Sequence, residues 1–165
     1  MNLVRDRVFV FTLLWIGFIL AISFMEAPLK FQAPSLTMPV ALEIGHLVFH
    51  ALNAVEIGLA VVILSITILS VWSPPVRRLT IVIVMVLVGQ TVLLYTALDT
   101  RTLAIINGNE VPEAPYHLVY IGVEVAKLLL LIRLAHLQIN EFGQKQVEWG
   151  KEIYVLHQSQ GAPRR

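Results

Sequence analysis

The sequence predicts an all-α integral membrane protein, a bundle of four transmembrane helices with both termini in the cytoplasm. Of its 165 residues, 57% are hydrophobic and only 14% are charged, whereas a soluble domain carries about 25% charged residues. The apolar residues gather in four long runs, and a helix needs roughly 20 such residues to cross the hydrocarbon. Most basic residues lie in every second one of the segments that precede, join or follow these runs, which predicts one orientation of the bundle in the membrane.

The apolar runs, in order, are residues 8–25, 40–72, 79–98 and 116–136. The first, third and fourth fit a single crossing, while the second is longer and is expected to tilt or to project from the membrane. No small-residue cleavage site follows the first run, so we interpret it as a retained helix and not as a signal peptide.

The connections carry turn and loop signals. Residues 26–39 contain three prolines, which predict an irregular loop, and "SPPVRR" (73–78) predicts a tight turn that stops the second helix. Residues 100–115 contain an Asn-Gly-Asn turn signal in a longer predicted loop. Residues 137–165 are polar and predict a cytoplasmic tail, with a short helix or strand around "QVEWGKEIYVL", beyond a transmembrane domain formed by residues 1–136.

The orientation follows from the positive-inside rule. Most of the basic residues lie before the first run, in the second connection, or at the end of the fourth run and beyond it: Arg5, Arg7, Arg77, Arg78, Arg133, Lys145, Lys151, Arg164 and Arg165. The first and third connections hold only Lys30 and Arg101. The expected location is the inner (cytoplasmic) membrane of a bacterium, with these two connections facing outward.

The composition also excludes several classes of site. The chain has no cysteine, which rules out disulfides, thiolate metal sites and cysteine nucleophiles within it. A net charge of +1 gives no reason to expect a nucleic acid as partner.

Polar residues form matching stripes on two of the predicted helices. "ALEIGHLVFHALNAVEIGLA" (41–60) is apolar enough for a bilayer, yet its polar side chains are Glu43, His46, His50, Asn53 and Glu56. The first four lie at offsets 0, 3, 7 and 10, and the same offsets recur in His117, Tyr120, Glu124 and Lys127. Each set covers an arc of about 80° on an α-helix, so both helices are expected to turn a polar face toward a common interior.

The predicted topology brings the polar residues of all four helices to the outer half of the membrane. They are Glu26, Glu43, His46, Thr91, Tyr95, Asp99, Tyr116 and His117. A charge at the bilayer centre costs roughly 2.5–3.5 kcal/mol on insertion scales. The polar groups must therefore be paired, hydrated or bound to a ligand.

One interpretation is a metal or haem site. Glu43 and His46 form the Glu-x-x-His pair of carboxylate-bridged di-metal bundles, and His46 and His50 lie one turn apart on one face. His117 could join them from the fourth helix. Candidate oxygen ligands are Glu124, Glu26 and Asp99. Imidazole and carboxylate together suit iron, manganese or zinc, and imidazole also suits copper.

Two other interpretations stay open. Glu56, Glu124 and Lys127 are candidates for a translocation path, because intramembrane acids and bases are common in proton relays and transporters. Alternatively these groups are structural: Glu56–Lys127 a buried ion pair, His50–Glu124 a hydrogen bond between helices, and Glu26 and Asp99 residues at the water interface. We assign no role to His136 and His157.

The first helix carries a short motif. Trp15-Ile-Gly17, followed by Ala27-Pro28-Leu-Lys-Phe31, resembles the first helix of the CopD-like superfamily of small membrane proteins, which includes copper-resistance CopD proteins and the HemJ type of protoporphyrinogen oxidase. "LDTRT" (98–102) and Tyr116-His117 resemble uncharacterised members of that superfamily. The HemJ pattern also has a histidine ahead of the tryptophan, and this chain has none there.

The resemblance implies a four-helix bundle and a haem or metal ion, and by analogy redox chemistry on a lipophilic substrate. A haem b would take its axial ligands from His46, His50 and His117. The ligands expected for iron, copper or zinc are Glu43, His46, His50, His117 and Glu124. The other expected polar core residues are Glu26, Asn53, Glu56, Tyr95, Asp99, Tyr120 and Lys127, with Tyr95 and Tyr120 as donors that orient the ligands.

The alternative function is a small transporter or an accessory subunit of a larger membrane complex. The expected partners are membrane lipid and either a second copy of the chain or the other subunits of such a complex.

Overall fold

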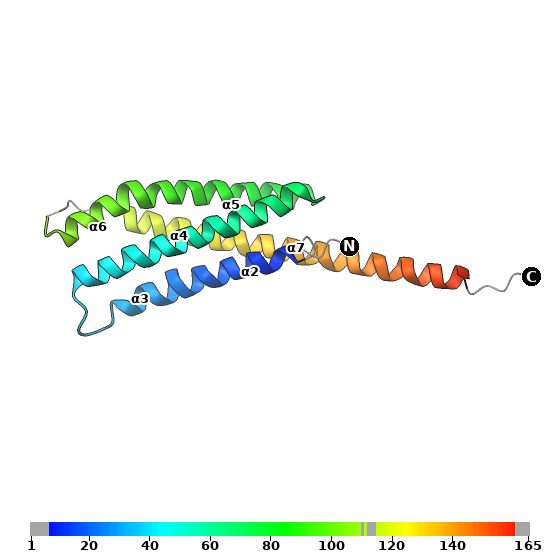
Figure 1. The fold of residues 1–165 in the computed structure, drawn as a ribbon, viewed down its shortest axis with the longest axis horizontal. Helices are drawn as coiled ribbons and strands as arrows, with labels where there is room; N and C mark the ends of the chain where they lie inside the picture. The colour runs from blue at the N-terminus through cyan, green and yellow to red at the C-terminus, as the bar shows by residue number, and fades with distance from the viewer. Residues whose placement is uncertain (1–6, 110, 112–114, 161–165) are drawn as a thin grey trace, which may run out of the picture.

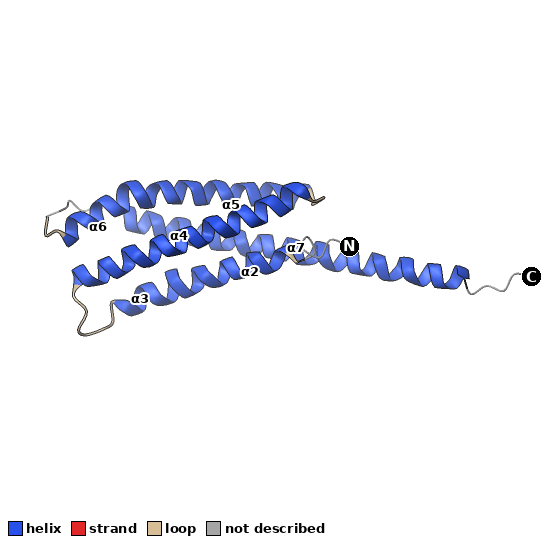
Figure 2. Ribbon diagram, in the orientation of Figure 1, coloured by secondary structure: helices blue, strands red, loops and turns tan. Residues whose placement is uncertain are grey.

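The computed structural model describes residues 7–109, 111 and 115–160, except for the side chains at 152, 153 and 155–160. These residues fold into long helices joined by short connections, and the part of the chain described contains no β-strand (Figure 2). The predicted all-α class is confirmed.

The first long helix is continuous but changes its winding near its end. It consists of α2 (Val8–Ile19), the π-helical η1 (Leu20–Glu26) and α3 (Ala27–Lys30). Pro28 lies in the first turn of α3, where its missing N–H and fixed φ are tolerated because the hydrogen-bond ladder has just been rearranged. The predicted loop over 26–39 is therefore confined to residues 31–37.

The second long helix, α4 (Met38–Leu69), ends before the double proline. Residues 70–73 make the turn, and Pro74 and Pro75 open α5 (Pro74–Leu93). Proline suits the first positions of a helix, where its missing N–H removes no intrahelical bond. The prolines thus start the third helix, whereas the sequence suggested that they stop the second.

The third long helix continues through the π-helical η2 (Leu94–Leu98) into α6 (Asp99–Ile106). The sequence placed a loop from residue 100, but positions 99–106 contain no proline or glycine, so nothing stops the helix there. The expected turn follows: Gly108 has φ +78° and donates to Ile105, and Asn109 donates to Ala104. This is a Schellman cap.

The last helix, α7 (Tyr116–Gln160), is a single element. The sequence left open a short helix or strand within a polar tail; the structure continues the fourth helix instead. Residues 116–160 contain no proline, so no residue in this range interrupts the helix. The division at residue 136 into a membrane domain and a cytoplasmic tail stays a prediction.

The helices form a bundle in the ring order α2, α4, α5, α7, with α7 also packed against α2. Figure 1 shows the 31–37 loop and the end of α6 at one end of the bundle, and the α4–α5 turn and the start of α2 at the other. The last part of α7 runs past this second end, beyond the other helices (Figure 1).

The surface suits a lipid environment. Val8–Lys30, Met38–Leu69 and Pro74–Ile106 are each long and apolar enough to cross a membrane. Large apolar side chains such as Leu47 and Met85 point outward, while Trp15 and Ile83 fill the interior. By length and composition, the protein is an integral membrane protein.

Candidate functional site

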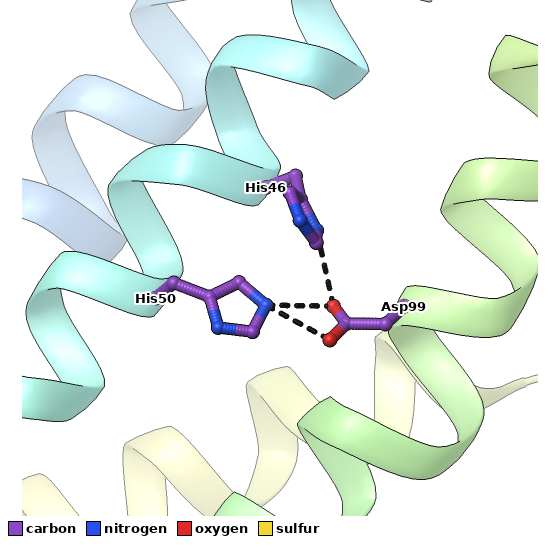
Figure 3. Close-up of side chains that lie close together, drawn as sticks. All are labelled: His46, His50 and Asp99. Carbon is purple, nitrogen blue, oxygen red and sulfur yellow. Dashed lines mark hydrogen bonds and ion pairs between the residues drawn. The ribbon is translucent and has the colours of Figure 1, made fainter.

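Three ligand-type side chains converge near the end of the bundle that holds the 31–37 loop. His46 and His50 extend from successive turns of α4, and Asp99 reaches them from the start of α6 (Figure 3). His50 Nε2 lies 2.9 Å from each oxygen of Asp99, and the two imidazole centroids are 4.4 Å apart. One nitrogen or oxygen from each residue lies within 4.8 Å of the other two, so all three could reach one ion.

The His46 ring lies beside the Asp99 carboxylate but makes no hydrogen bond to it. Its Nδ1 lies 3.1 Å from Asp99 Oδ1, yet this buried nitrogen has no partner with hydrogen-bond geometry among the described residues. A buried polar atom without a partner costs free energy. Since the tautomer of an imidazole is assigned from its surroundings, His46 can carry its proton on Nε2. The lone pair of His46 Nδ1 would then be free to bind a cation.

A cavity of about 340 Å³ lies beside this cluster, and residues of all four long helices line it. His46 and Asp99 line one part of it, and Glu124 lines another. Apolar and aromatic side chains supply much of the remaining wall: Phe24, Phe31, Leu42, Phe49, Leu94, Leu98 and Ile121. The π-helical segments η1 and η2 both contribute to the wall, and such segments are frequent at functional sites.

A cation lies at another part of this wall. The Lys30 side chain is only 8% exposed; its ammonium is 3.5 Å from Glu26 Oε2 and 5.3 Å from the centroid of Phe49. Gly45 makes room for it, because a Cβ at that position would lie 2.8 Å from Lys30 Nζ. A positive group is thus held beside the mostly apolar cavity.

Farther along the bundle, a buried ion network crosses its centre. Lys127 on α7 forms ion pairs with Glu56 on α4 and with Glu124, which lies 3.0 Å away one turn earlier on α7. All three side chains are essentially inaccessible. Trp15 Nε1 donates to Glu56 Oε1 at 2.7 Å.

Gln90 on α5 completes the network. Its Oε1 accepts from Lys127 Nζ at 2.7 Å, and its Nε2 donates to Glu124 Oε2. Ser23 Oγ donates to Glu124 Oε1 at 3.0 Å. Residues from four long helices therefore share one polar network.

Several sequence-predicted residues lie apart from the histidine cluster. Glu43 is exposed, and the structure does not bring it to His46, because it points out of the bundle near the start of α4. His117 lines the cavity but is not within ligand distance of the cluster. Glu124 belongs to the ion network, and His50 bonds to Asp99 in place of the expected Glu124.

The other predicted polar residues pair locally. Glu56 and Lys127 form the expected ion pair, and Asn53 Nδ2 donates to Thr91 Oγ1 at 2.8 Å. Tyr120 is buried with its ring edge-on to Phe49, whereas Tyr95, with its ring edge-on to His50, is 53% exposed. Of the histidines without an assigned role, His136 is exposed near Asn140, and the side chain of His157 is outside the described set.

Sequence reasoning named Trp15 and Lys30 without giving them these contacts, and it missed Ser23 and Gln90. Gln90 carried a usable signal, because it is an uncharged polar residue inside the apolar run 79–98. The sequence prediction assigned Lys30 to an irregular loop, so its position one helical turn after Glu26 was not foreseen.

Comparison with known families gives one match. The sequence profile described as "Domain of unknown function (DUF4149)" matches residues 10–109, which is more than half of the chain. The chain belongs to this family. The DUF4149 match includes His46, His50 and Asp99, and it also includes Trp15, Glu56 and Gln90, but it stops before α7. Searches of curated proteins and of solved structures each found no match.

Proposed function

We propose that this DUF4149 protein holds a divalent transition metal ion, iron or zinc, in the outer half of a four-helix membrane bundle. The observation that supports this most strongly is the convergence of His46, His50 and Asp99 beside a cavity. Two imidazoles and one carboxylate form the donor set of non-haem iron(II) sites. Three protein ligands with a free position are also the arrangement of catalytic zinc.

The donor set favours a metal ion over a haem. His46 and His50 lie one turn apart on the same helix with their rings 4.4 Å apart, so they cannot coordinate from opposite faces of a porphyrin. Because His46 and Asp99 also line the cavity, the open coordination positions would face that space. A lipophilic molecule would suit the apolar wall, and redox chemistry on it is the prediction that comes from the CopD-like resemblance.

The topology is part of the proposal. The first part of α7 packs against α2 and α5 and places Glu124 and Lys127 inside the bundle, which favours α7 as a fourth crossing. Arg77 and Arg78 lie at the end where α4 turns into α5. By the positive-inside rule this end is cytoplasmic, and the metal site is then in the outer half.

Metal content tests the proposal directly. Protein purified without an affinity metal is reconstituted with iron(II) or zinc, and the bound metal is measured by elemental analysis. We expect one ion per chain in the wild type and near-complete loss in His50→Ala and Asp99→Asn. Glu43→Gln is the matched control, because Glu43 lies on the same helix but is exposed, and it should keep the ion.

Wild-type protein that takes up neither metal, or cluster variants that retain it, would end the metal proposal. A Soret band in the purified protein would instead indicate haem. Metal-free protein that supports proton-coupled uptake in liposomes would favour the transport alternative.

A further inference from the structure

The ion network in the bundle centre contains unequal numbers of acids and bases. Glu56 and Glu124 are both buried, and Lys127 is the cation that contacts them. Within the described part of the chain, no second cation forms an ion pair with either carboxylate. With both acids ionised, the network would hold one uncompensated negative charge inside a membrane bundle, a state that low-dielectric surroundings strongly disfavour.

The donors around the two acids are not divided evenly. One carboxylate oxygen of Glu124 accepts a hydrogen bond from Ser23. The other accepts a hydrogen bond from Gln90 and forms the ion pair with Lys127. Both of its oxygens therefore face donors, which suits an ionised carboxylate.

Glu56 has a different environment. Trp15 and Lys127 both approach Oε1, whereas Oε2 is buried and has no hydrogen-bond partner in the described structure. An ionised carboxylate with one bare oxygen is poorly stabilised, and a proton on that oxygen removes the charge. Glu56 Oε2 is thus the place in the network with room for a proton.

The surroundings suggest where such a proton would exchange. On the side away from the histidine cluster, the network meets the buried apolar residues Ile63, Ile83 and Leu131. On the other side, Glu124 itself lines the cavity, and so do Ser23 and Tyr120. The described opening next to the network is therefore the cavity.

We propose that Glu56 and Glu124 together hold one exchangeable proton, which rests on Glu56, and that Lys127, which contacts both acids, connects Glu56 to Glu124 at the cavity wall. The pair is then a proton store at the base of the cavity, able to donate to, or accept from, a molecule bound there. The buried titratable groups in this region are Glu56, Glu124, Lys127 and Tyr120, and a coupled pair of acids titrates as a unit. This inference does not depend on metal binding.

Infrared spectroscopy of the full chain in detergent tests the shared proton. At neutral pH the wild type should show the carbonyl stretch of a protonated carboxylic acid, and this band should shift when the buffer is exchanged for D₂O. Glu56→Gln should abolish the band, because it removes the protonated acid. Glu124→Gln should also abolish it, because Lys127 then has Glu56 as its single carboxylate and ionises it.

Two variants serve as controls. Glu43→Gln and Asp99→Asn change carboxyl groups outside the network, and both should keep the band. Size-exclusion chromatography and circular dichroism establish that each variant is folded before its spectrum is compared.

Absence of the band from wild-type protein would overturn the shared proton even if a glutamine variant fails to fold. Persistence of the band in either folded glutamine variant would overturn it as well. A band that does not shift in D₂O would overturn the exchange with the cavity.

Discussion

At the scale of single residues, most buried polar side chains among the described residues have at least one polar partner, although single atoms such as His46 Nδ1 and Glu56 Oε2 have none. In the segment 43–56, His50 pairs with Asp99, Asn53 bonds to Thr91, and Glu56 contacts Lys127, while the His46 ring lies beside Asp99 and Glu43 is exposed. Buried polar groups are tolerated when each finds a partner. Removing one partner is therefore more harmful than removing the pair.

Lys127→Met should strongly destabilise the bundle. Breaking a buried ion pair from one side costs about 3–5 kcal/mol, because the remaining charge is left uncompensated. The double variant Lys127→Met/Glu124→Gln removes that charge and should recover much of the loss. Thermal unfolding in detergent measures both, and a Lys127→Met variant as stable as wild type would contradict the account of the network.

Thr91→Val should cost about 1–3 kcal/mol, because it leaves the buried Asn53 amide without its acceptor. Thr96→Val is the matched control: Thr96 is exposed, and its hydroxyl donates to the carbonyl of Val92 in its own helix. The control should change the free energy of unfolding by less than about 0.5 kcal/mol. Equal effects in the two variants would show that the Asn53–Thr91 bond contributes nothing.

Periodicity alone predicted much of this residue-level picture. The 3.6-residue repeat placed His46, His50, Asn53, Tyr120, Glu124 and Lys127 inside, and they are partly or fully buried. It failed for Glu43 and His117, which are both exposed near the start of their helices, because helical position says nothing about where the bundle ends. It could not pair His50 with Asp99 in preference to Glu124, because that choice depends on the relative rotation and tilt of three helices.

At the scale of elements, two π-helical segments shape the cavity. η1 and η2 lie in different long helices, yet both contribute to its wall. Each π turn shifts the residues that follow it around the helix axis, and Asp99 comes directly after η2. These segments were not predicted from the sequence, since a π turn depends on local hydrogen bonding that composition does not record.

The length of α7 leads to a prediction about its end. Gln138 accepts a hydrogen bond from Thr12, Glu141 binds Ser73 at the start of α5, and Lys145 lies over Trp72. Truncation after residue 146 should therefore leave thermal unfolding unchanged. Truncation after residue 137 removes all three contacts and should lower the unfolding temperature by several degrees, because each buried hydrogen bond to a polar partner is worth about 1 kcal/mol. Similar unfolding of both truncations would show that these contacts are dispensable.

At the scale of the whole molecule, the sequence predicted the fold class and the long helices, and it erred at their ends. Apolar runs identified each helix, because bilayer-length hydrophobicity is a strong signal. The ends were missed where a helix continued into polar sequence, as α6 and α7 do. Hydropathy detects the membrane boundary, and a helix does not have to stop there.

The proposed orientation can be tested on the whole molecule, because the sequence has no cysteine and a single introduced thiol reports its own side of the membrane. Ser35 lies in the exposed 31–37 loop, and Gln146 is exposed on α7. In spheroplasts, a membrane-impermeant maleimide should label Ser35→Cys directly and Gln146→Cys only after permeabilisation. The reverse pattern would invert the topology. Labelling of both cysteines without permeabilisation would mean that α7 does not cross the membrane, because three crossings from a cytoplasmic N-terminus leave the rest of the chain outside. Lys127 would then lie in a helix beside the membrane and not within it.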